Sequence, residues 1–175
     1  MKNSMNFIAP HYTMRRMMDD YFDRFYTGLA ARSAHLHANG NKIARELVDW
    51  KRAVASEWDS LRIVSVEDSG NSSNVSNERY TGTHETIRLV LDKASLSCDL
   101  EVELVDAREE ADGKLRLVAK TPLRLVEKEG TKEVYELAFT QSRPGLYKRA
   151  IRIVPTHPEL PHRMDFALVR WVALQ

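Results

Sequence analysis

The sequence predicts an α+β fold in which an N-terminal antiparallel helical hairpin precedes an immunoglobulin-like antiparallel β-sandwich of about seven strands. Apolar residues recur at helical spacing as far as Trp58, and from Leu61 they alternate at a spacing of two. Turn signals separate the strand-like runs at intervals of roughly 8–12 residues, with no helical pattern between them. We therefore expect two domains, a helical arm over residues 1–59 and a β-sandwich over residues 60–175.

The first helix is expected from Thr13, which can cap it, to Ala38, where Asn39-Gly40 favours a left-handed ending. Its apolar arc covers about half the circumference, whereas a helix with one contact needs roughly 100°. The arc contains Met14, Met17, Met18, Tyr21, Phe22, Phe25, Tyr26, Leu29 and Leu36. Such a wide arc predicts two partners, of which one is the second helix and the other is a domain that this chain does not contain.

A second helix is expected from Lys42 to Trp58, with Asn41 as its cap. Its apolar stripe, spaced at three and four residues, consists of Ile43, Leu47, Trp50, Val54 and Trp58. The link between the two helices is so short that it predicts an antiparallel hairpin.

Strands are expected over residues 61–66, 86–91, 99–105, 114–121, 133–140, 146–154 and 165–174, with residues 123–127 as the continuation of the fourth strand after Pro122. Asp112-Gly113 and Glu129-Gly130 are turn signals, and the Ser- and Asn-rich stretch from Ser69 to His84 is expected to be a loop. The last run is apolar on both faces, which predicts a strand covered on both sides.

The composition of the chain excludes several classes of partner and site. The net charge is +1, and acidic and basic residues are interspersed, so neither a nucleic-acid partner nor a membrane partner is expected. Cys98 is the only cysteine, which rules out an internal disulfide and a cysteine-based zinc site and favours a reducing cytoplasm. No run is apolar enough for a membrane span, and residues 1–10 lack the pattern of a signal peptide.

No catalytic, cofactor-binding or metal-binding residue is predicted. His35 and His37 suit the end of a helix, and Asp19, Asp20 and Asp23 suit the start of one. His157, His162 and Asp165 flank a proline-rich turn that is expected to be structural, and Glu101 and Glu103 are expected to be solvated residues on an outward strand face. Strand aromatics such as Tyr80, Tyr135 and Tyr147 could stack on sugars, but roles in the core are favoured.

Residues 6–26, NFIAPHYTMRRMMDDYFDRFY, resemble the C-terminal end of bacterial and archaeal α-glucan (glycogen or maltodextrin) phosphorylases. The shared features are Ile8-Ala9-Pro10, Arg16-Met17 and the acidic residue and tyrosine of Asp20-Tyr21. Weaker markers follow at Gly145-Leu146-Tyr147, Arg152–Pro155, His157-Pro158 and Val169-Arg170-Trp171. The resemblance therefore covers nearly the whole chain.

The resemblance implies a glycosyltransferase that moves glucose from the end of an α-1,4-glucan to phosphate, giving glucose 1-phosphate. That family uses pyridoxal phosphate, whose phosphate group relays a proton, and its cofactor lysine lies in a Gly-Met-Lys-Ala-like context that no lysine here has. The glucan- and phosphate-binding residues belong to upstream parts of the family fold. The chain is therefore expected to be a non-catalytic, structural or docking portion, inactive alone, with the upstream catalytic domains as its partner.

Two alternatives stay open from the sequence. One is an autonomous glycan-binding β-sandwich that stacks exposed aromatics on an α-glucan. The other is a self-associating interaction module that forms a homodimer through the first helix, since burial of each large apolar side chain contributes roughly 1.5–3 kcal/mol.

Overall fold

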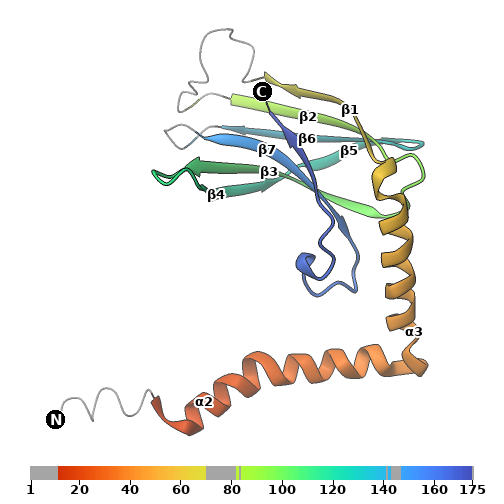
Figure 1. Cartoon of the computed structure of the whole chain (residues 1–175), viewed down its shortest axis with the longest axis vertical. Helices are drawn as coiled ribbons and strands as arrows, with labels where there is room; N and C mark the ends of the chain where they lie inside the picture. Colours follow the sequence, from red (N-terminus) through yellow and green to blue (C-terminus); the bar gives the residue numbers. More distant parts are fainter. Residues whose placement is uncertain (1–11, 70–81, 83, 141, 143–146, 175) are drawn as a thin grey trace, which may run out of the picture. The chain divides into compact units, whose positions relative to one another are not determined.

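The computed structural model describes residues 12–69, 82, 84–140, 142 and 147–174. The chain divides into two compact units, Met1–Trp50 and Lys51–Gln175, and each is described by itself (Figure 1). Most of the loop expected between Ser69 and His84 lies outside the described residues. The predicted domain boundary after residue 59 stays a prediction.

The first unit begins with helix α2, Met14–Tyr21, and continues through a π-helical turn, η2, Phe22–Tyr26. Thr13 caps α2 as predicted, because its Oγ1 accepts a hydrogen bond from the Arg16 amide at 3.3 Å. The sequence did not predict the π turn, in which the Thr27 hydroxyl donates to the Phe22 carbonyl at 2.9 Å. A π turn holds one extra residue, so it rotates the residues after it relative to those before it.

Helix α3, Thr27–Glu57, follows, and its backbone is interrupted where the sequence predicted a helix end. Asn39, Gly40 and Asn41 have φ values of 51°, 64° and 64°, a left-handed conformation that Gly and Asn tolerate best. The helical backbone is therefore broken over residues 38–41, where the first helix was predicted to end and the second to begin. The antiparallel hairpin stays a prediction.

The second unit begins with the C-terminal end of α3, which is hydrogen-bonded to the loop that contains Ser97. Val54, Trp58 and Leu61 are buried, as the apolar stripe predicted for the first two. Glu57 Oε2 accepts a hydrogen bond from the Ser97 amide at 3.3 Å. A 3₁₀ turn, η3, Trp58–Ser60, then leads directly into the first strand.

Eight antiparallel strands form two four-stranded sheets, with orders β1-β2-β6-β5 and β4-β3-β7-β8 (Figure 1). The strands are β1 Arg62–Asp68, β2 His84–Asp92, β3 Asp99–Glu109, β4 Leu115–Pro122, β5 Arg124–Glu129, β6 Lys132–Thr140, β7 Lys148–Thr156 and β8 Arg170–Ala173. The hairpin turns hold Gly113 (φ 79°) and Gly130 (φ 60°), as the two turn signals predicted. The α+β class is therefore confirmed.

The core is made of alternating apolar residues from the middle strands of both sheets. One sheet contributes Ile87, Leu89, Leu91 and Tyr135, and the other contributes Val102, Leu104, Ile151 and Ile153, all of them 4% exposed or less. The alternation that predicted the strands thus also marks their inward faces.

The last strand differs from the prediction of a strand over residues 165–174. Only Arg170–Ala173 pair with β7, and Arg163–Asp165 form a 3₁₀ turn, η5. Val172 is buried but Trp171 is 50% exposed, so within the described structure only one face of β8 is buried. An apolar run does not distinguish a strand from a loop that covers a sheet, because both bury alternate residues.

Candidate functional site

Three charged residues lie in the inward rows of the strands, at the same end of the two sheets. Glu85 precedes Ile87 on β2, Arg149 precedes Ile151 on β7, and Asp106 follows Leu104 on β3. The exposed fractions of the three side chains are 1%, 3% and 19%. Charges at this depth persist only where they are paired, because desolvation of a lone ion is costly.

Arg149 pairs with both carboxylates. Its Nη1 donates to Glu85 on the opposite sheet, and its Nε donates to Asp106 Oδ1 at 2.7 Å on the neighbouring strand. The guanidinium also lies 5.1 Å from the centre of the Phe139 ring, in cation–π geometry. One side chain therefore joins β2, β3, β6 and β7.

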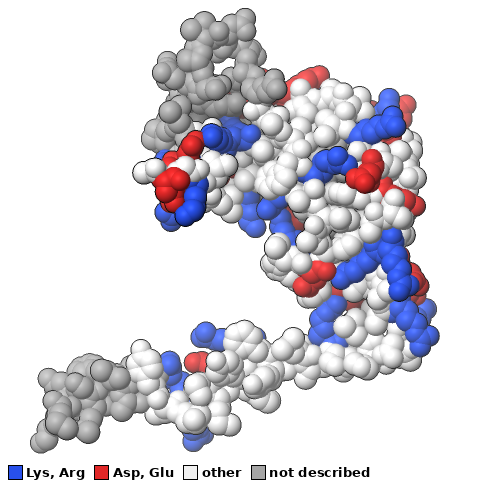
Figure 2. All heavy atoms as spheres, in the orientation of Figure 1, with Lys and Arg blue, Asp and Glu red and all other residues white. Residues whose placement is uncertain are grey.

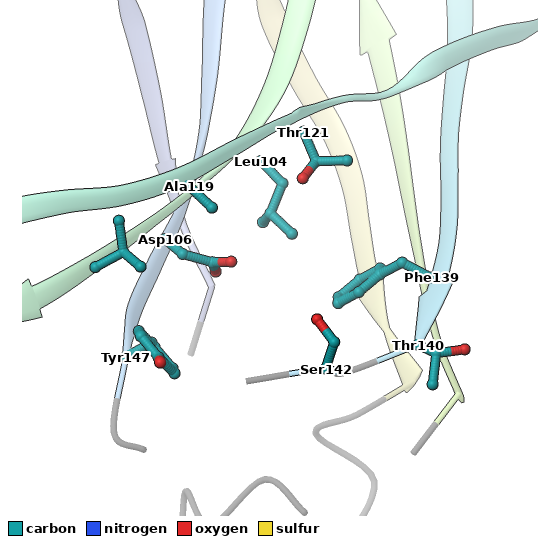
Figure 3. Close-up of a pocket in the computed structure, with 9 residues that line it drawn as sticks. Leu104, Asp106, Ala119, Thr121, Phe139, Thr140, Ser142 and Tyr147 are labelled. Atoms are coloured by element: carbon teal, nitrogen blue, oxygen red, sulfur yellow. The ribbon is translucent and has the colours of Figure 1, made fainter. Parts of the chain in front are cut away.

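A pocket of about 210 Å³ lies beside this ion pair (Figure 3). Its walls come from both sheets and consist of Leu104, Asp106, Val118, Ala119, Thr121, Phe139, Thr140, Ser142 and Tyr147. Tyr147 is held in place by Arg108, which donates to the phenol oxygen at 3.1 Å and lies 5.4 Å from the ring centre. The pocket thus combines one carboxylate, several hydroxyls and aromatic carbon.

A second cluster lies on the outer face of β3 and centres on Glu103. Arg152 donates to Glu103 from Nε at 3.1 Å, and Arg163 of η5 donates from Nη1 at 2.7 Å. Arg163 Nη2 also donates to Glu101 Oε1 at 3.0 Å. Glu103 is only 4% exposed, so the prediction that it is a solvated outward residue is wrong. The segment that contains η5 covers this face of the sheet.

Burial of Glu103 raises its pKa, but hydrogen bonds from Arg163 and Arg152 outweigh the burial and bring the pKa to about 2. The hydrogen bond to Glu103 in turn raises the pKa of Arg163. Glu103 is therefore a permanent anion at neutral pH, and its arrangement with two arginines serves to clamp the segment onto the sheet.

The polar side chains around the proline-rich turn form hydrogen bonds to backbone amides two or three residues away. His162 Nδ1 accepts from the Met164 amide at 3.1 Å, and Asp165 Oδ2 accepts from the His162 amide at 3.2 Å, which together cap η5. His157 Nδ1 accepts from the Glu159 amide at 3.1 Å. The structure thus places these three residues in turn geometry and not around a common centre.

The other residues that the sequence singled out are also dispersed. His37 Nδ1 bonds the Ser33 carbonyl at 2.7 Å, and Asp20 lies 3.9 Å from Arg24. Tyr135 is buried and donates to Glu133 at 2.8 Å, whereas Tyr80 lies outside the described residues. In the ranges that the structure describes, no three His, Cys, Asp or Glu residues are placed to hold a metal ion.

The sequence did not predict the pocket and its ion pair, although it contains a signal for the ion pair. Glu85, Asp106 and Arg149 each continue an inward apolar row by one step of two residues. Charged residues of both signs at the ends of inward rows indicate a buried pair.

None of the helices in the described ranges is both long enough and apolar enough to cross a membrane.

Comparison with known proteins identifies the family. Residues 58–173 match the family model described as the glycogen phosphorylase C-terminal domain. Over 98% of its length the chain is 28% identical to the maltodextrin phosphorylase of the archaeon Thermococcus litoralis. The chain spans only 20% of the length of that protein. The family model covers well over half of this sequence, and the chain therefore belongs to the glycogen phosphorylase C-terminal domain family.

Proposed function

We propose that this chain is the non-catalytic C-terminal portion of an α-glucan phosphorylase and that it docks onto the catalytic domains of that enzyme. The family match and the similarity to a maltodextrin phosphorylase support the parent enzyme. In this proposal the whole enzyme acts in the cytoplasm and releases glucose 1-phosphate from the end of an α-1,4-glucan. The chain itself supplies a docking surface and no catalytic group.

The observation that carries the docking role is an exposed apolar surface on α2, η2 and the start of α3. This surface, here named the apolar helix face, consists of Met14, Met17, Met18, Tyr21, Phe22, Phe25, Tyr26 and Leu29. Every one of these side chains is at least 45% exposed. Figure 2 shows a mainly uncharged surface over η2 and the start of α3, with the charged atoms of this segment gathered around α2. Contiguous apolar surface of this extent marks an interaction site.

The rings of this face are already ordered against one another. Tyr21 lies 5.8 Å from Phe25 and 6.4 Å from Tyr26, measured between ring centres. A partner that binds here therefore orders few additional side chains, which lowers the entropic cost of association. Full burial of each large apolar side chain contributes roughly 1.5–3 kcal/mol.

Pyridoxal phosphate, the cofactor of the resembled family, does not fit the described residues. A cofactor lysine needs an amine that is desolvated, so that it loses its proton readily, and that is not held in an ion pair. Among the described lysines Lys93 alone is buried, and its ammonium donates to Glu133 Oε1 at 3.2 Å and to the Cys98 carbonyl. We assign the cofactor to the catalytic domains of the parent enzyme.

The finer architecture belongs to the same proposal. We infer a helical arm over residues 1–59, folded as an antiparallel hairpin, and an immunoglobulin-like sandwich over residues 60–175. Two four-stranded antiparallel sheets support the sandwich, and the family match over residues 58–173 supports its boundaries.

The test is to express this sequence together with the coding sequence that precedes it. We expect a phosphorylase-like catalytic region there, and phosphorolysis of maltodextrin only when both portions are present. Phe25→Asp should abolish association or activity, because it places a charge within the apolar helix face. Ala34→Asp is the matched control, since Ala34 is exposed and lies about two and a half helical turns after Phe25, which places it on the opposite side of the helix.

Absence of any phosphorylase-like sequence upstream would refute the proposal. Equal effects of the two aspartate variants would refute the docking surface. Sedimentation of this chain alone measures self-association through the same face. A dimer that remains stable after the catalytic region is added would favour the alternative of a self-associating interaction module.

A further inference from the structure

We propose that the pocket between β3, β4 and β6 binds a single pyranose ring, and that the ring is a glucosyl unit of an α-glucan (Figure 3). The choice of glucose rests on the proposed function. The preference for a neutral, ring-shaped polyol rests on the pocket alone and is argued first.

The charge in the pocket is already balanced. Asp106 is the carboxylate in the wall, and Arg149 donates to its Oδ1 from outside the pocket at 2.7 Å. A cationic ligand would compete with Arg149, and an anionic ligand would meet the Asp106 charge. A neutral ligand that donates hydroxyl hydrogens to this carboxylate avoids both conflicts.

The polar groups of the wall match a polyol. Figure 3 shows the Asp106 carboxylate and the Thr121 hydroxyl directed into the same space, with Ser142 on the opposite side. A carboxylate only accepts hydrogen bonds, whereas a hydroxyl both donates and accepts. A sugar hydroxyl does both as well, so neighbouring sugar hydroxyls can bond to Asp106 and Thr121 together.

The remaining walls are apolar and suit the C–H faces of a sugar ring. Phe139 lies across the pocket from Asp106, and Leu104 adds apolar wall near Thr121. The Arg149 guanidinium lies over the Phe139 ring, 5.1 Å from the ring centre, and holds the ring in place. Binding sites that combine fixed aromatic surface with a few convergent polar groups are typical for small ligands.

The volume sets the size of the ligand. Drug-sized molecules occupy pockets of roughly 300–1,000 Å³. The present pocket, at about 210 Å³, is smaller, which suits one sugar ring and excludes an oligosaccharide lying lengthwise. A glucan would therefore insert a terminal unit and leave the rest of the chain in solvent.

The experiment is a titration of the complete chain with maltose, followed by amide chemical shifts. We expect millimolar binding and shifts concentrated on residues 104–106, 119–121 and 139–140. Ala119→Leu fills the pocket and should weaken binding at least tenfold, and Thr121→Val should weaken it about threefold to tenfold, the effect of one lost hydrogen bond. Ala138→Leu is the matched control, because Ala138 is exposed on β6 outside the pocket, and it should bind as the unchanged protein does.

Sorbitol, which is an open-chain polyol, and cellobiose, which is a β-linked disaccharide, are the comparison ligands. Weaker binding of both supports the assignment to an α-glucan end, whereas equal binding of sorbitol overturns the ring preference. Absence of shifts with maltose, shifts confined to another surface such as that around Trp171, or full binding by Ala119→Leu would overturn the pocket. These results are independent of the upstream coding sequence, so failure here leaves the docking proposal standing, and failure of docking leaves a sugar-binding pocket.

Discussion

The guanidinium of Arg149 on β7 donates a hydrogen bond to the buried carboxylate of Glu85 on β2, so one ion pair joins the two sheets. The same guanidinium holds Asp106 on its own sheet. A buried charge whose partner is removed is costly, whereas an apolar replacement of both partners is often neutral. The pair therefore constrains how the sheets face each other at the end where the pocket lies.

Arg149→Met should lower the free energy of unfolding by about 3–5 kcal/mol, because it leaves the Glu85 carboxylate without its Arg149 partner. Urea denaturation measures the loss. The double variant Arg149→Met with Glu85→Leu should recover much of the stability, since it also removes the buried carboxylate that the single variant leaves without Arg149. A single variant within 1 kcal/mol of the unchanged protein would contradict the assigned role.

Stability should depend on pH through Glu103. Its pKa falls from 4.5 to about 2 on folding, so its contribution is complete above pH 4.5 and is lost as the pH falls toward 2. The depression corresponds to about 3 kcal/mol at neutral pH. Glu103→Gln should therefore be less stable at pH 7, and the gap should close at low pH. Glu109→Gln removes a half-exposed pair with Lys148 and should change stability by less than about 1 kcal/mol.

Cys98 should react slowly with thiol reagents in the folded protein. Burial raises the pKa of its thiol from 9.0 to about 11, which lowers the thiolate fraction at pH 8 by about a hundredfold. Iodoacetamide labelling with and without denaturant measures the ratio, and Cys98→Ser provides the blank. Rapid labelling of the folded chain would show that the thiol is accessible.

Two glycines should respond to alanine in opposite directions. Gly113 has φ of 79° in the β3–β4 turn, so Gly113→Ala should destabilise by about 1–2 kcal/mol through backbone strain. Gly28 lies in α3, and open space surrounds the position of an added Cβ. Gly28→Ala should therefore raise helix stability by about 0.5–1 kcal/mol. Circular dichroism during thermal unfolding reports both changes.

Alternation of apolar residues was sufficient to locate most strands. Ile87, Leu89 and Leu91 predicted an inward row, and all three are fully buried. The turn signals were also reliable, because Gly113 and Gly130 adopt the positive φ that their positions require. Both features depend on residues that are close together in the sequence, so they can be read from the sequence directly.

Features that depend on what covers a surface were not predictable in this way. Glu101 and Glu103 alternate with core residues, which correctly assigns them to the outer face of β3. The burial of Glu103 depends on Arg163, which lies 60 residues away in a segment without periodicity. Trp171 shows the converse, since its apolar character predicted a covered face and it is half exposed. Distant segments decide both outcomes.

The strand order has a consequence for the fate of the free chain. It leaves β1, β5, β4 and β8 at the edges of the two sheets, where unpaired backbone groups can template the addition of a foreign strand. The β5 edge carries Arg124, Glu127, Lys128 and Glu129, and β8 is only four residues long. Charge and shortness both discourage edge-to-edge polymerisation. A free copy of this chain is therefore protected from amyloid-like aggregation through these two edges.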